Sequence, residues 1–475
     1  MPNPSSSSGP ASHRTAAVVL AAGLGTRMRS KRPKVLHPLC GRPMLDYVLD
    51  AWAAAATTAA TPTTAVVVYS PATEAVRELV GDRAGLALQP EPRGTGDAVA
   101  AALPEIDDEV DEIVVLSGDV PLVLPSHLEA VLEQRRLDDA ALALASVFAA
   151  DPGELGRVVR GEFGSVQRIV EARDAAPDDL ETNEVNAGLY AFDAAWLRRR
   201  IGDLRPSAGN GELYLTDLVA MAREDGRIVS AVGFDDDGTF DGINDRSQLA
   251  QAEWALRVRI NEAHMRAGVT MRDPSTAYVD WGVELAADVI LEPNVVLRGR
   301  TSVGEGSVIG PSSTVVDSSI GRDSLVWASV VESSAVGDDV RIGPFSHLRP
   351  GSQVDRGAEV GNYAELKNSH LGEGVKSHHV SYLGDADLGP GTNVGAGTIT
   401  ANFDGRSKHR TTVGRGAFLG VDTMLVAPVT VGDGAKTGAG AVVTRDVPSG
   451  QLAVGVPARV REPRPTPEPE PTPEG

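Results

Sequence analysis

A glycine-containing loop that carries basic side chains is the first stretch of this sequence that could do chemistry. Residues 20–28 read LAAGLGTRM, so Arg27 lies in the loop, and Lys34 follows shortly after it. Glycine lets the backbone of such a loop approach a ligand, exposed N–H groups face an anion, and basic side chains neutralise phosphate charge. The spacing fits neither the Walker A pattern nor GxGxxG, so an ordinary turn is the common alternative.

An acidic residue just beyond an apolar run is the second candidate. Residues 113–116 read IVVL, which predicts a buried strand, and Asp119 follows it. Open α/β sheets bind ligands beyond the carboxyl ends of their strands, and a carboxylate there is a hard oxygen donor suited to Mg²⁺. We therefore predict that Asp119 is a metal ligand, against the common alternative of an aspartate that caps the next segment.

Two adjacent histidines, His378 and His379, are the third candidate, because histidine can accept a proton near neutral pH. Neighbouring residues of a strand point to opposite faces, so only one of the two should enter a cleft. An ordinary surface histidine is the simpler interpretation of either residue alone.

The N-terminal half must supply the elements that hold the first two candidates. Short apolar runs alternate there with helix-like stretches, which is typical of an α/β domain. The runs predict strands at 16–20, 65–69, 86–89, 113–116 and 142–148, with helices at 73–80 and 97–103. Asp245 or Ser247 is expected to cap a further helix. One apolar stripe runs along that helix through Leu249, Ala252, Leu256, Ile260 and Ala263.

The C-terminal half repeats an aliphatic residue every sixth position between Leu291 and Val443. A fixed short period predicts a solenoid, in which each repeat buries its apolar side chain against the next. Six residues per side suit a triangular coil. The period breaks at 366–371, 383–388 and 402–412, and polar candidates cluster beside these breaks. A solenoid without chemistry is the alternative that the repeats leave open.

Composition excludes several classes of protein. The 475-residue chain has a formal charge of -21 and no basic run, so it is a poor binder of nucleic acid or of anionic membranes. Its single cysteine, Cys40, excludes an internal disulfide and a cysteine-cage metal site. No apolar run approaches the ~18 residues that span a bilayer, and the first residues lack the apolar core of a signal peptide. We expect a cytoplasmic protein without membrane insertion.

Longer strings carry a resemblance to known families. LAAGLGTRM and PKVLHPLCGRPML at 33–45 resemble the opening of the sugar-phosphate nucleotidyltransferases. The hexapeptide period resembles the acyltransferases that fold as a left-handed parallel β-helix. With LRPG at 348–351, GNYAELK at 361–367 and VGAGTITANFDG at 394–405, the order of both halves resembles the bacterial bifunctional N-acetylglucosamine-1-phosphate uridylyltransferases and glucosamine-1-phosphate N-acetyltransferases, over about residues 16–457.

The resemblance implies an α/β Rossmann-like uridylyltransferase domain at 15–245, a linker helix at 246–267 and a β-helix acetyltransferase domain at 268–460. The flanking segments 1–14 and 461–475, rich in Ser and Pro or in Pro and Glu, are expected to be disordered tails.

The family is a cytoplasmic homotrimer that makes UDP-N-acetylglucosamine for cell-wall precursors. It acetylates glucosamine-1-phosphate with acetyl-CoA. It then transfers uridylyl from UTP to N-acetylglucosamine-1-phosphate, with Mg²⁺ as cofactor and pyrophosphate as the leaving group.

The resemblance also implies the residues of the uridylyl site. Arg27 and Lys34 neutralise the phosphates, Asp119 and Asn244 hold Mg²⁺, and Gln89 with Gly94 and Thr95 reads the base. The whole implied site comprises Leu20, Ala21, Ala22, Gly23, Arg27, Lys34, Gln89, Gly94, Thr95, Ser117, Gly118, Asp119, Gly156, Glu171, Asn186 and Asn244. After Thr95 the sequence has Gly96-Asp97 where the family commonly has Ala-His.

In the acetyl site, the resemblance assigns His379 as the general base, with Glu365 orienting or polarising it. The sugar phosphate would be bound by Arg349, Lys367, Tyr382 and Asn393, and acetyl-CoA by Ala396, Asn402, Phe403, Val421 and Ala439. Lys408, in the 402–412 break, is expected near a neighbouring chain.

The sequence departs from the family at three positions of the coenzyme site. Phe403 replaces a tyrosine, Val421 replaces a hydroxyl residue, and the arginine before Val456-Pro457 is missing, for which Arg459 or Arg461 is the expected substitute.

Two other functions remain open on the sequence. The first is a monofunctional nucleotidyltransferase whose β-helix serves assembly or regulation, but this function does not explain why the second half carries its set of candidate polar residues. The second is a pure acyltransferase with a degenerate first domain, which does not explain why the 20–34 string is intact.

Overall fold

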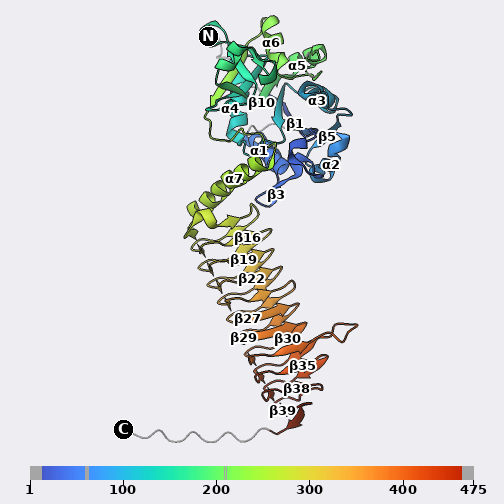
Figure 1. Cartoon of the computed structure of the whole chain (residues 1–475), viewed down its shortest axis with the longest axis vertical. Coiled ribbons are helices and arrows are strands. Elements are labelled where there is room, and N and C mark those ends of the chain that lie inside the picture. Colours follow the sequence, from blue (N-terminus) through green and yellow to red (C-terminus); the bar gives the residue numbers. More distant parts are fainter. Residues whose placement is uncertain (1–12, 59–63, 208, 210, 463–475) are drawn as a thin grey trace, which may run out of the picture. The chain divides into compact units, whose positions relative to one another are not determined.

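The computed structural model describes residues 13–58, 64–207, 209 and 211–462. The chain consists of two compact units that divide between Leu256 and Arg257 (Figure 1). Most of the predicted tails 1–14 and 461–475 fall outside the described residues. Their inner ends correct the predicted boundaries, because Arg14 bonds through its backbone to Asp111 and Arg461 pairs with Leu452.

The first unit is built on a mainly parallel sheet in the order β11-β7-β10-β6-β1-β4-β5, in which only β10 runs antiparallel to its neighbours. A hairpin of β8 and β9 joins the sheet through β10, and β2 pairs with β3. The strands are β1 Thr15–Leu20, β2 Pro38–Leu39, β3 Arg42–Pro43, β4 Thr64–Tyr69, β5 Gly85–Leu88, β6 Glu112–Ser117, β7 Leu142–Phe148, β8 Arg157–Arg160, β9 Val166–Val170, β10 Glu184–Asp193 and β11 Val229–Phe234.

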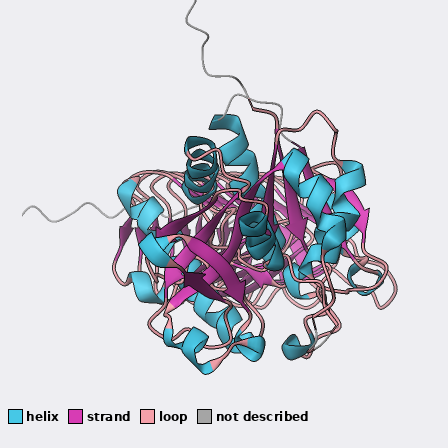
Figure 2. Ribbon diagram, turned by 90° about the horizontal axis from the view of Figure 1, so that it is seen from above, coloured by secondary structure: helices cyan, strands magenta, loops and turns pink. Residues whose placement is uncertain are grey.

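Helices cover both faces of this sheet (Figure 2), which is why its strands read as continuous apolar runs. On one face α1 packs against α4, while α3, α5 and α6 contact strands from the other. The helices are α1 Met44–Thr58, α2 Val76–Val80, α3 Thr95–Ala102, α4 Pro125–Leu137, α5 Ala194–Arg200 and α6 Asp217–Glu224. The predicted 73–80 helix is shorter than expected, because a separate capped turn occupies Pro71–Thr73.

A buried charge cluster joins β6 to α4. Glu112, fully buried, accepts hydrogen bonds from Arg135 at 2.6 Å and from Arg136. Burial raises the pKa of Glu112, but the bonds from the two arginines outweigh it, so the net pKa lies below its ordinary value.

Replacing Glu112 with alanine should therefore lower the free energy of unfolding by about 3–5 kcal/mol, because two arginines lose their buried partner. Denaturant unfolding measures the loss. Arg77→Ala, which removes an exposed pair with Glu74, is the matched control and should cost at most about 1 kcal/mol. Equal effects of the two substitutions would show that the cluster adds nothing to stability.

Helix α7 spans Arg246–Arg266 and contains the division between the units. Asp245 is its cap, since its carboxylate accepts hydrogen bonds from the backbone N–H groups of Ser247 and Gln248. Ala252, Leu256 and Ile260 of the predicted stripe are buried, whereas Ala263 is exposed. No helix in the described part of the chain is long and apolar enough to cross a membrane.

The second unit is a parallel β-helix of three stacked strand faces. Face 1 comprises β12 Thr270–Met271, β15 Ile290–Leu291, β18 Val308–Ile309, β21 Leu325–Val326, β24 Arg341–Ile342, the first halves of β27 Glu359–Lys367 and β29 Lys376–Gly384, β31 Asn393–Val394, β34 Phe418–Leu419, β37 Lys436–Thr437 and β39 Leu452–Val454.

Face 2 comprises β13 Tyr278–Val279, β16 Val296–Arg298, β19 Thr314–Val316, β22 Val330–Glu332, β25 His347–Leu348, the second halves of β27 and β29, β32 Ile399–Ala401, β35 Met424–Val426 and β38 Val442–Val443. Face 3 comprises β14 Glu284–Leu285, β17 Ser302–Val303, β20 Ser319–Ile320, β23 Ala335–Val336, β26 Gln353–Val354, β28 His370–Leu371, β30 Ala386–Leu388, β33 Thr411–Val413 and β36 Val429–Val431. The last strand, β40 Arg459–Arg461, pairs antiparallel with β39.

The inward residues of the coil follow the predicted aliphatic column, but short sides are more frequent than expected. Besides 366–371 and 383–388, the structure has five-residue sides at 315–320, 326–331 and 331–336. Each short side carries a left-handed residue two places after its inward residue, which tightens the corner. These residues are Asp317, Ala328, Ser333, Asn368 and Asp385.

Candidate functional sites

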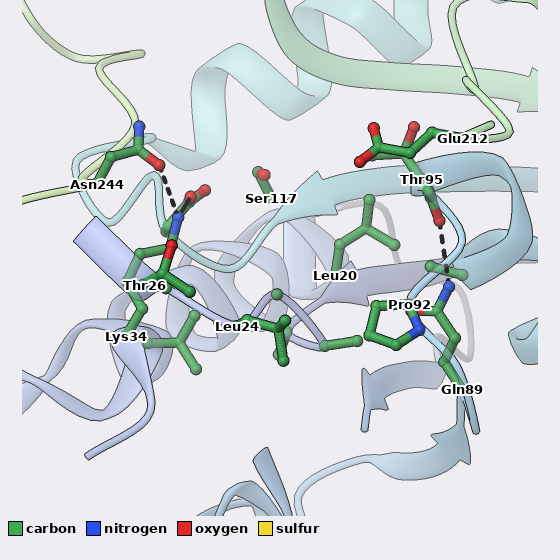
Figure 3. A pocket seen from close by; sticks show the side chains of 18 of the residues that line it. Leu20, Leu24, Thr26, Lys34, Gln89, Pro92, Thr95, Ser117, Glu212 and Asn244 are labelled. Carbon is green, nitrogen blue, oxygen red and sulfur yellow. Dashed lines mark hydrogen bonds and ion pairs between the residues drawn. The ribbon is translucent and has the colours of Figure 1, made fainter. Parts of the chain in front are cut away.

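The first candidate site is a pocket of about 570 Å³ beyond the carboxyl ends of β1, β5 and β6, where Leu20, Gln89 and Ser117 lie. Strand order changes direction at β1, so this is the edge at which open α/β sheets bind ligands. Figure 3 shows Lys34 and Asn244 at one end of the pocket and Gln89 and Thr95 at the other. Most of the predicted residues line it, but Gly118, Gly156 and Asn186 do not.

Two predicted metal ligands converge on one ammonium group at the first end. Lys34 forms an ion pair with Asp119 and donates to Asn244 Oδ1 at 2.9 Å. The side chains of Lys34 and Asp119 are only 12% and 18% exposed. Asn244 donates through Nδ2 to the Gly242 carbonyl, which leaves its Oδ1 directed at Lys34.

The backbone around this centre has little room. A Cβ on Gly25, whose φ is +58°, would lie 2.7 Å from Lys34 Cβ, so glycine is needed there for both its conformation and its size. Lys34 opens a short 3₁₀ turn, Lys34–Leu36, behind Pro33. Ile243 N–H donates to the Asp119 carbonyl at 2.9 Å and thereby ties the two oxygen-bearing loops together.

The charges of the pocket fit an added divalent cation. Arg27, Lys34 and Arg173 are balanced by Asp119, Glu154, Glu171 and Glu212, so the side chains alone do not neutralise a polyphosphate. Asp119 and Asn244 already share one cation and are the hard oxygen donors that Mg²⁺ prefers, with water and phosphate oxygens completing its shell. Among the described residues, no group of three or more His, Cys, Asp or Glu offers another metal cage.

The opposite end of the pocket is rigid. Gln89 Nε2 donates to the Gly94 carbonyl at 3.2 Å and to Asp97 Oδ2 at 2.8 Å. A Cβ on Gly94 would lie 2.5 Å from the Leu213 carbonyl oxygen, so no larger residue fits. Thr95 accepts from the Leu215 N–H at 3.0 Å, and its hydroxyl is also a hydrogen-bond donor.

Glu171 lines the same pocket and accepts a hydrogen bond from Thr216 at 3.1 Å. Gly156 lies behind Glu171, since a Cβ there would be 3.6 Å from its carboxylate, and Asn186 N–H donates to the Gly156 carbonyl. Burial raises the pKa of Glu171, and the bond from Thr216 offsets this only in part.

Because the pKa of Glu171 is raised, we predict that its charged carboxylate lowers the free energy of unfolding. A carboxyl group whose folded pKa is raised favours folding when protonated, and stability is lost as pH rises from its ordinary pKa, about 4.3, through the folded value. Glu171→Gln should therefore raise the melting temperature at pH 7 and change it little at pH 3.5. Glu154→Gln, at an exposed position, should show no such pH dependence. A lower melting temperature of Glu171→Gln at pH 7 would contradict the assignment.

Sequence reasoning missed several residues that line this pocket. Gly25 and Thr26 lie inside the LAAGLGTRM string, and Glu212 and Tyr214 lie in the GELYLTD string at 211–217, so both strings held the signal. Glu154 and Arg173 had no local signal, because Glu154 lies in a turn before β8 and Arg173 in a short 3₁₀ helix after β9.

In the second unit, the predicted base and part of the predicted coenzyme site share one edge of the coil. His379 pairs in register with Asn362 at the corner between face 1 and face 2. Ala396, Val421 and Ala439 occupy the same corner in the following coils, where Ala396 accepts from Asp422 N–H and Val421 from Gly440 N–H.

The expectation that only one histidine enters a cleft is wrong. Both His378 and His379 line a cavity of about 380 Å³. His379 and Val380 lie at the corner, both exposed, so the alternation of an ordinary strand is lost there. The two rings are nearly perpendicular, and His378 is bonded to Glu359 at 2.9 Å.

Glu365 accepts a hydrogen bond from Arg349 at 2.9 Å, and among the described residues no hydrogen bond joins it to His379. Its register partner in the next coil is Tyr382, because the strands carry the two residues on face 2 rather than at the corner. Glu365 therefore holds Arg349, and its role toward His379 stays a prediction.

A basic group gathers at the far end of face 2. Lys408 lies beside Lys367 and lowers the pKa of that ammonium group. The Tyr382 side chain extends along its own strand toward the end of face 2, since a Cβ on Gly384 would lie 2.5 Å from its hydroxyl. With Arg349, these side chains offer an anion site next to a hydroxyl donor.

Lys408 is carried by the loop that follows β32, which projects from the stacked coils near β30 (Figure 1). Asp404 organises the loop by accepting from the N–H groups of Arg406 and Ser407 and from His409, and these bonds lower its pKa to about 2. Phe403 bridges to Lys408 and is exposed.

Three predicted residues, Asn393, Arg459 and Arg461, lie apart from these groups, and a fourth, Asn402, is tied to Asp385 beside them. Asn393 belongs to face 1, between Lys376 and Phe418, and not to the face that carries Arg349 and Tyr382. The Asn402 amide is buried and committed to Asp385. Arg459 and Arg461 lie in the exposed strand β40.

Comparisons with known proteins cover both units. Residues 17–176 match the family model of the MobA-like NTP transferase domain. The chain is 45% identical over 444 residues to the bifunctional protein GlmU of Rubrobacter xylanophilus, which covers 94% of this chain and 93% of that protein. The proteins of the same name from Heliobacterium modesticaldum and Mycobacterium bovis are each 44% identical, over 93% of this chain and 95% and 90% of their own length.

Proposed function

The chain belongs to the family of bifunctional GlmU proteins, and from this premise we propose how its two units make UDP-N-acetylglucosamine. The pocket of the first unit transfers uridylyl from UTP to N-acetylglucosamine-1-phosphate. The second unit acetylates glucosamine-1-phosphate with acetyl-CoA. The observation that carries the proposal is the presence of two separate polar constellations, one in each unit.

Uridylyl transfer needs positioning and charge neutralisation more than a protein nucleophile. Lys34 lies at the end of the pocket that would take the phosphates, Gln89 and Thr95 lie at the end that would take the base, and Arg27 lines the same pocket. Glu171 accepts hydrogen bonds from the sugar, and Gly156, whose carbonyl accepts from the Asn186 N–H of β10, lies behind it. The sugar phosphate oxygen then attacks the α-phosphorus in line, and pyrophosphate leaves toward the basic end.

Asp119 and Asn244 would hold Mg²⁺, since their oxygens already converge on one cation. When bound, Mg²⁺ supplies charge neutralisation to the phosphate oxygens. The Lys34 ammonium group now lies between these two oxygens, where Mg²⁺ would bind. Lys34 would therefore turn toward the phosphates when the metal binds.

Acetyl transfer needs a neutral amine on the substrate. His379, exposed at its corner, takes the proton as the amine attacks the thioester. Arg349, Lys367 and Lys408 bind the sugar phosphate, whose charge relieves the repulsion between the two lysines. Tyr382 contacts the sugar, and Glu365 fixes Arg349.

Acetyl-CoA binds along the corner below His379. Ala396, Val421 and Ala439 are small or aliphatic there, so the coenzyme meets backbone and apolar surface. Phe403, exposed on the loop, offers a ring to stack on. Asn402 acts through Asp385 at the base of that loop and positions Lys408.

We propose a homotrimer, which the split of the acetyl site over two faces supports. Asn393 lies on face 1 and Tyr382 on face 2, so one chain does not bring them together, whereas a closed three-fold ring sets face 1 of one copy against face 2 of the next. Exposed apolar residues line the corner, including the stacked rings of Phe345 and Tyr363. Light scattering should give three times 49.6 kDa, and an active monomer would overturn the assembly.

The experiment that tests the whole proposal assays the purified chain for uridylyl transfer and for acetyl transfer separately. Both activities should be present. Uridylyl transfer alone would reduce the β-helix to assembly or regulation, and acetyl transfer alone would make the first unit degenerate.

A further inference from the structure

The orientation of the Gln89 side-chain amide is fixed by two hydrogen bonds within the protein. It is only 2% exposed, and its nitrogen is directed at the Gly94 carbonyl and the Asp97 carboxylate. Both neighbours are hydrogen-bond acceptors, so the nitrogen and not the oxygen of the amide must face them. An amide nitrogen has two hydrogens, and both are committed to the protein.

Asp97 is itself held in place. Arg93 Nη2 donates to Asp97 Oδ1 at 2.8 Å from the exposed side, while Oδ2 accepts from Gln89. The side chain of Asp97 is 14% exposed and that of Arg93 is 64% exposed, so the carboxylate is sheltered and its partner is not. This is the position at which the sequence departs from the family's common Ala-His pair.

We propose that Asp97 is a positioning residue that sets nucleotide specificity by locking the orientation of Gln89. With both N–H groups engaged, Gln89 presents only its Oε1 to the base. A uracil ring carries an N–H at N3 and satisfies this acceptor, whereas a cytosine ring presents a lone pair there and repels it. The Thr95 hydroxyl supplies the donor that a uracil carbonyl needs.

This inference rests on the proposed uridylyl transfer and goes beyond it, because it assigns the choice between UTP and CTP to a residue that does not touch the nucleotide. Without the Asp97 carboxylate, only the longer bond of 3.2 Å to the Gly94 carbonyl holds the Gln89 amide, which then turns more readily and presents its nitrogen to cytosine. Replacement by asparagine keeps the volume but supplies an N–H that bonds the Gln89 oxygen and favours the turned amide.

The test measures kcat/KM of the full chain with UTP and with CTP, at a fixed concentration of N-acetylglucosamine-1-phosphate. Asp97→Asn should lower the ratio of kcat/KM for UTP to kcat/KM for CTP by about tenfold or more. The reason is that the buried Gln89 oxygen no longer faces the ring nitrogen of cytosine without a hydrogen-bond donor. Arg93→Ala, which leaves the carboxylate in place, is the matched control and should keep the ratio. Asp97→Ala serves as a second variant, with acetyl transfer and circular dichroism as checks of folding.

An unchanged ratio in both folded Asp97 variants overturns the inference, even if both rates fall, because a merely structural residue would change the rates together. A wild-type chain that transfers no uridylyl group overturns the proposed function itself. The two failures are distinguished by the wild-type assay, which is made first.

Discussion

Replacing His379 with alanine is expected to lower the rate of acetyl transfer by about 10²–10⁴-fold, the range lost when a general base is removed. The amine of glucosamine-1-phosphate is mostly protonated near neutral pH, and His379 is the group assigned to take its proton. Uridylyl transfer should be unchanged, since its pocket lies in the other unit. Light scattering should show the same assembly as the wild type.

His378→Ala is the matched control, because the two histidines are adjacent and line one cavity. The substitution removes a partner of Glu359, which keeps Lys376 nearby at 3.8 Å. The loss of acetyl transfer should therefore be much milder. If His378→Ala proved the more damaging of the two, His378 would be the base and the assignment made here would be wrong.

Asp119→Ala should abolish uridylyl transfer, a loss of at least about 10³-fold, because removal of one preorganised electrostatic group in such a site already costs about 10²–10³-fold. Two defects add in this variant. Lys34 loses the carboxylate that places its ammonium group, and Asn244 is left as the one remaining protein oxygen of the proposed Mg²⁺ site.

Acetyl transfer by the same variant should persist at the wild-type rate. An equal fall of both activities in a folded protein would refute two independent sites. Asn244→Ala provides a graded comparison, since it removes a neutral ligand and leaves the Lys34–Asp119 pair intact, and its loss should be smaller.

The convergence of Lys34, Asp119 and Asn244 could be predicted from the sequence only in part. Strand ends and a family string placed each residue near a sheet edge. The single ammonium group between two oxygens depends on side-chain orientation, which neither periodicity nor strings encode. The same holds for Gln89, whose contact with Asp97 resolves a departure that the sequence left unexplained.

The sequence predicted the inward aliphatic residues of the β-helix but not the structure of its corners. Leu291 to Val443 repeat a simple apolar signal. Corner residues such as His379 follow neither the alternation of a strand nor the period of six. The direction of their side chains could therefore not be predicted from the sequence. The bond between Glu365 and Arg349 was not predicted for the same reason, because Arg349 belongs to the previous coil.

The left-handed corners of the five-residue sides have a consequence for comparing relatives of this chain. A single residue can be lost at such a corner without moving the inward column on either side, as at Asp317, Ala328 and Ser333. A change in chain length can then be accommodated within a single side of the coil. An alignment that imposes a fixed period of six residues on 315–336 will place inward residues against outward ones. Gaps placed at the corners will keep equivalent faces together.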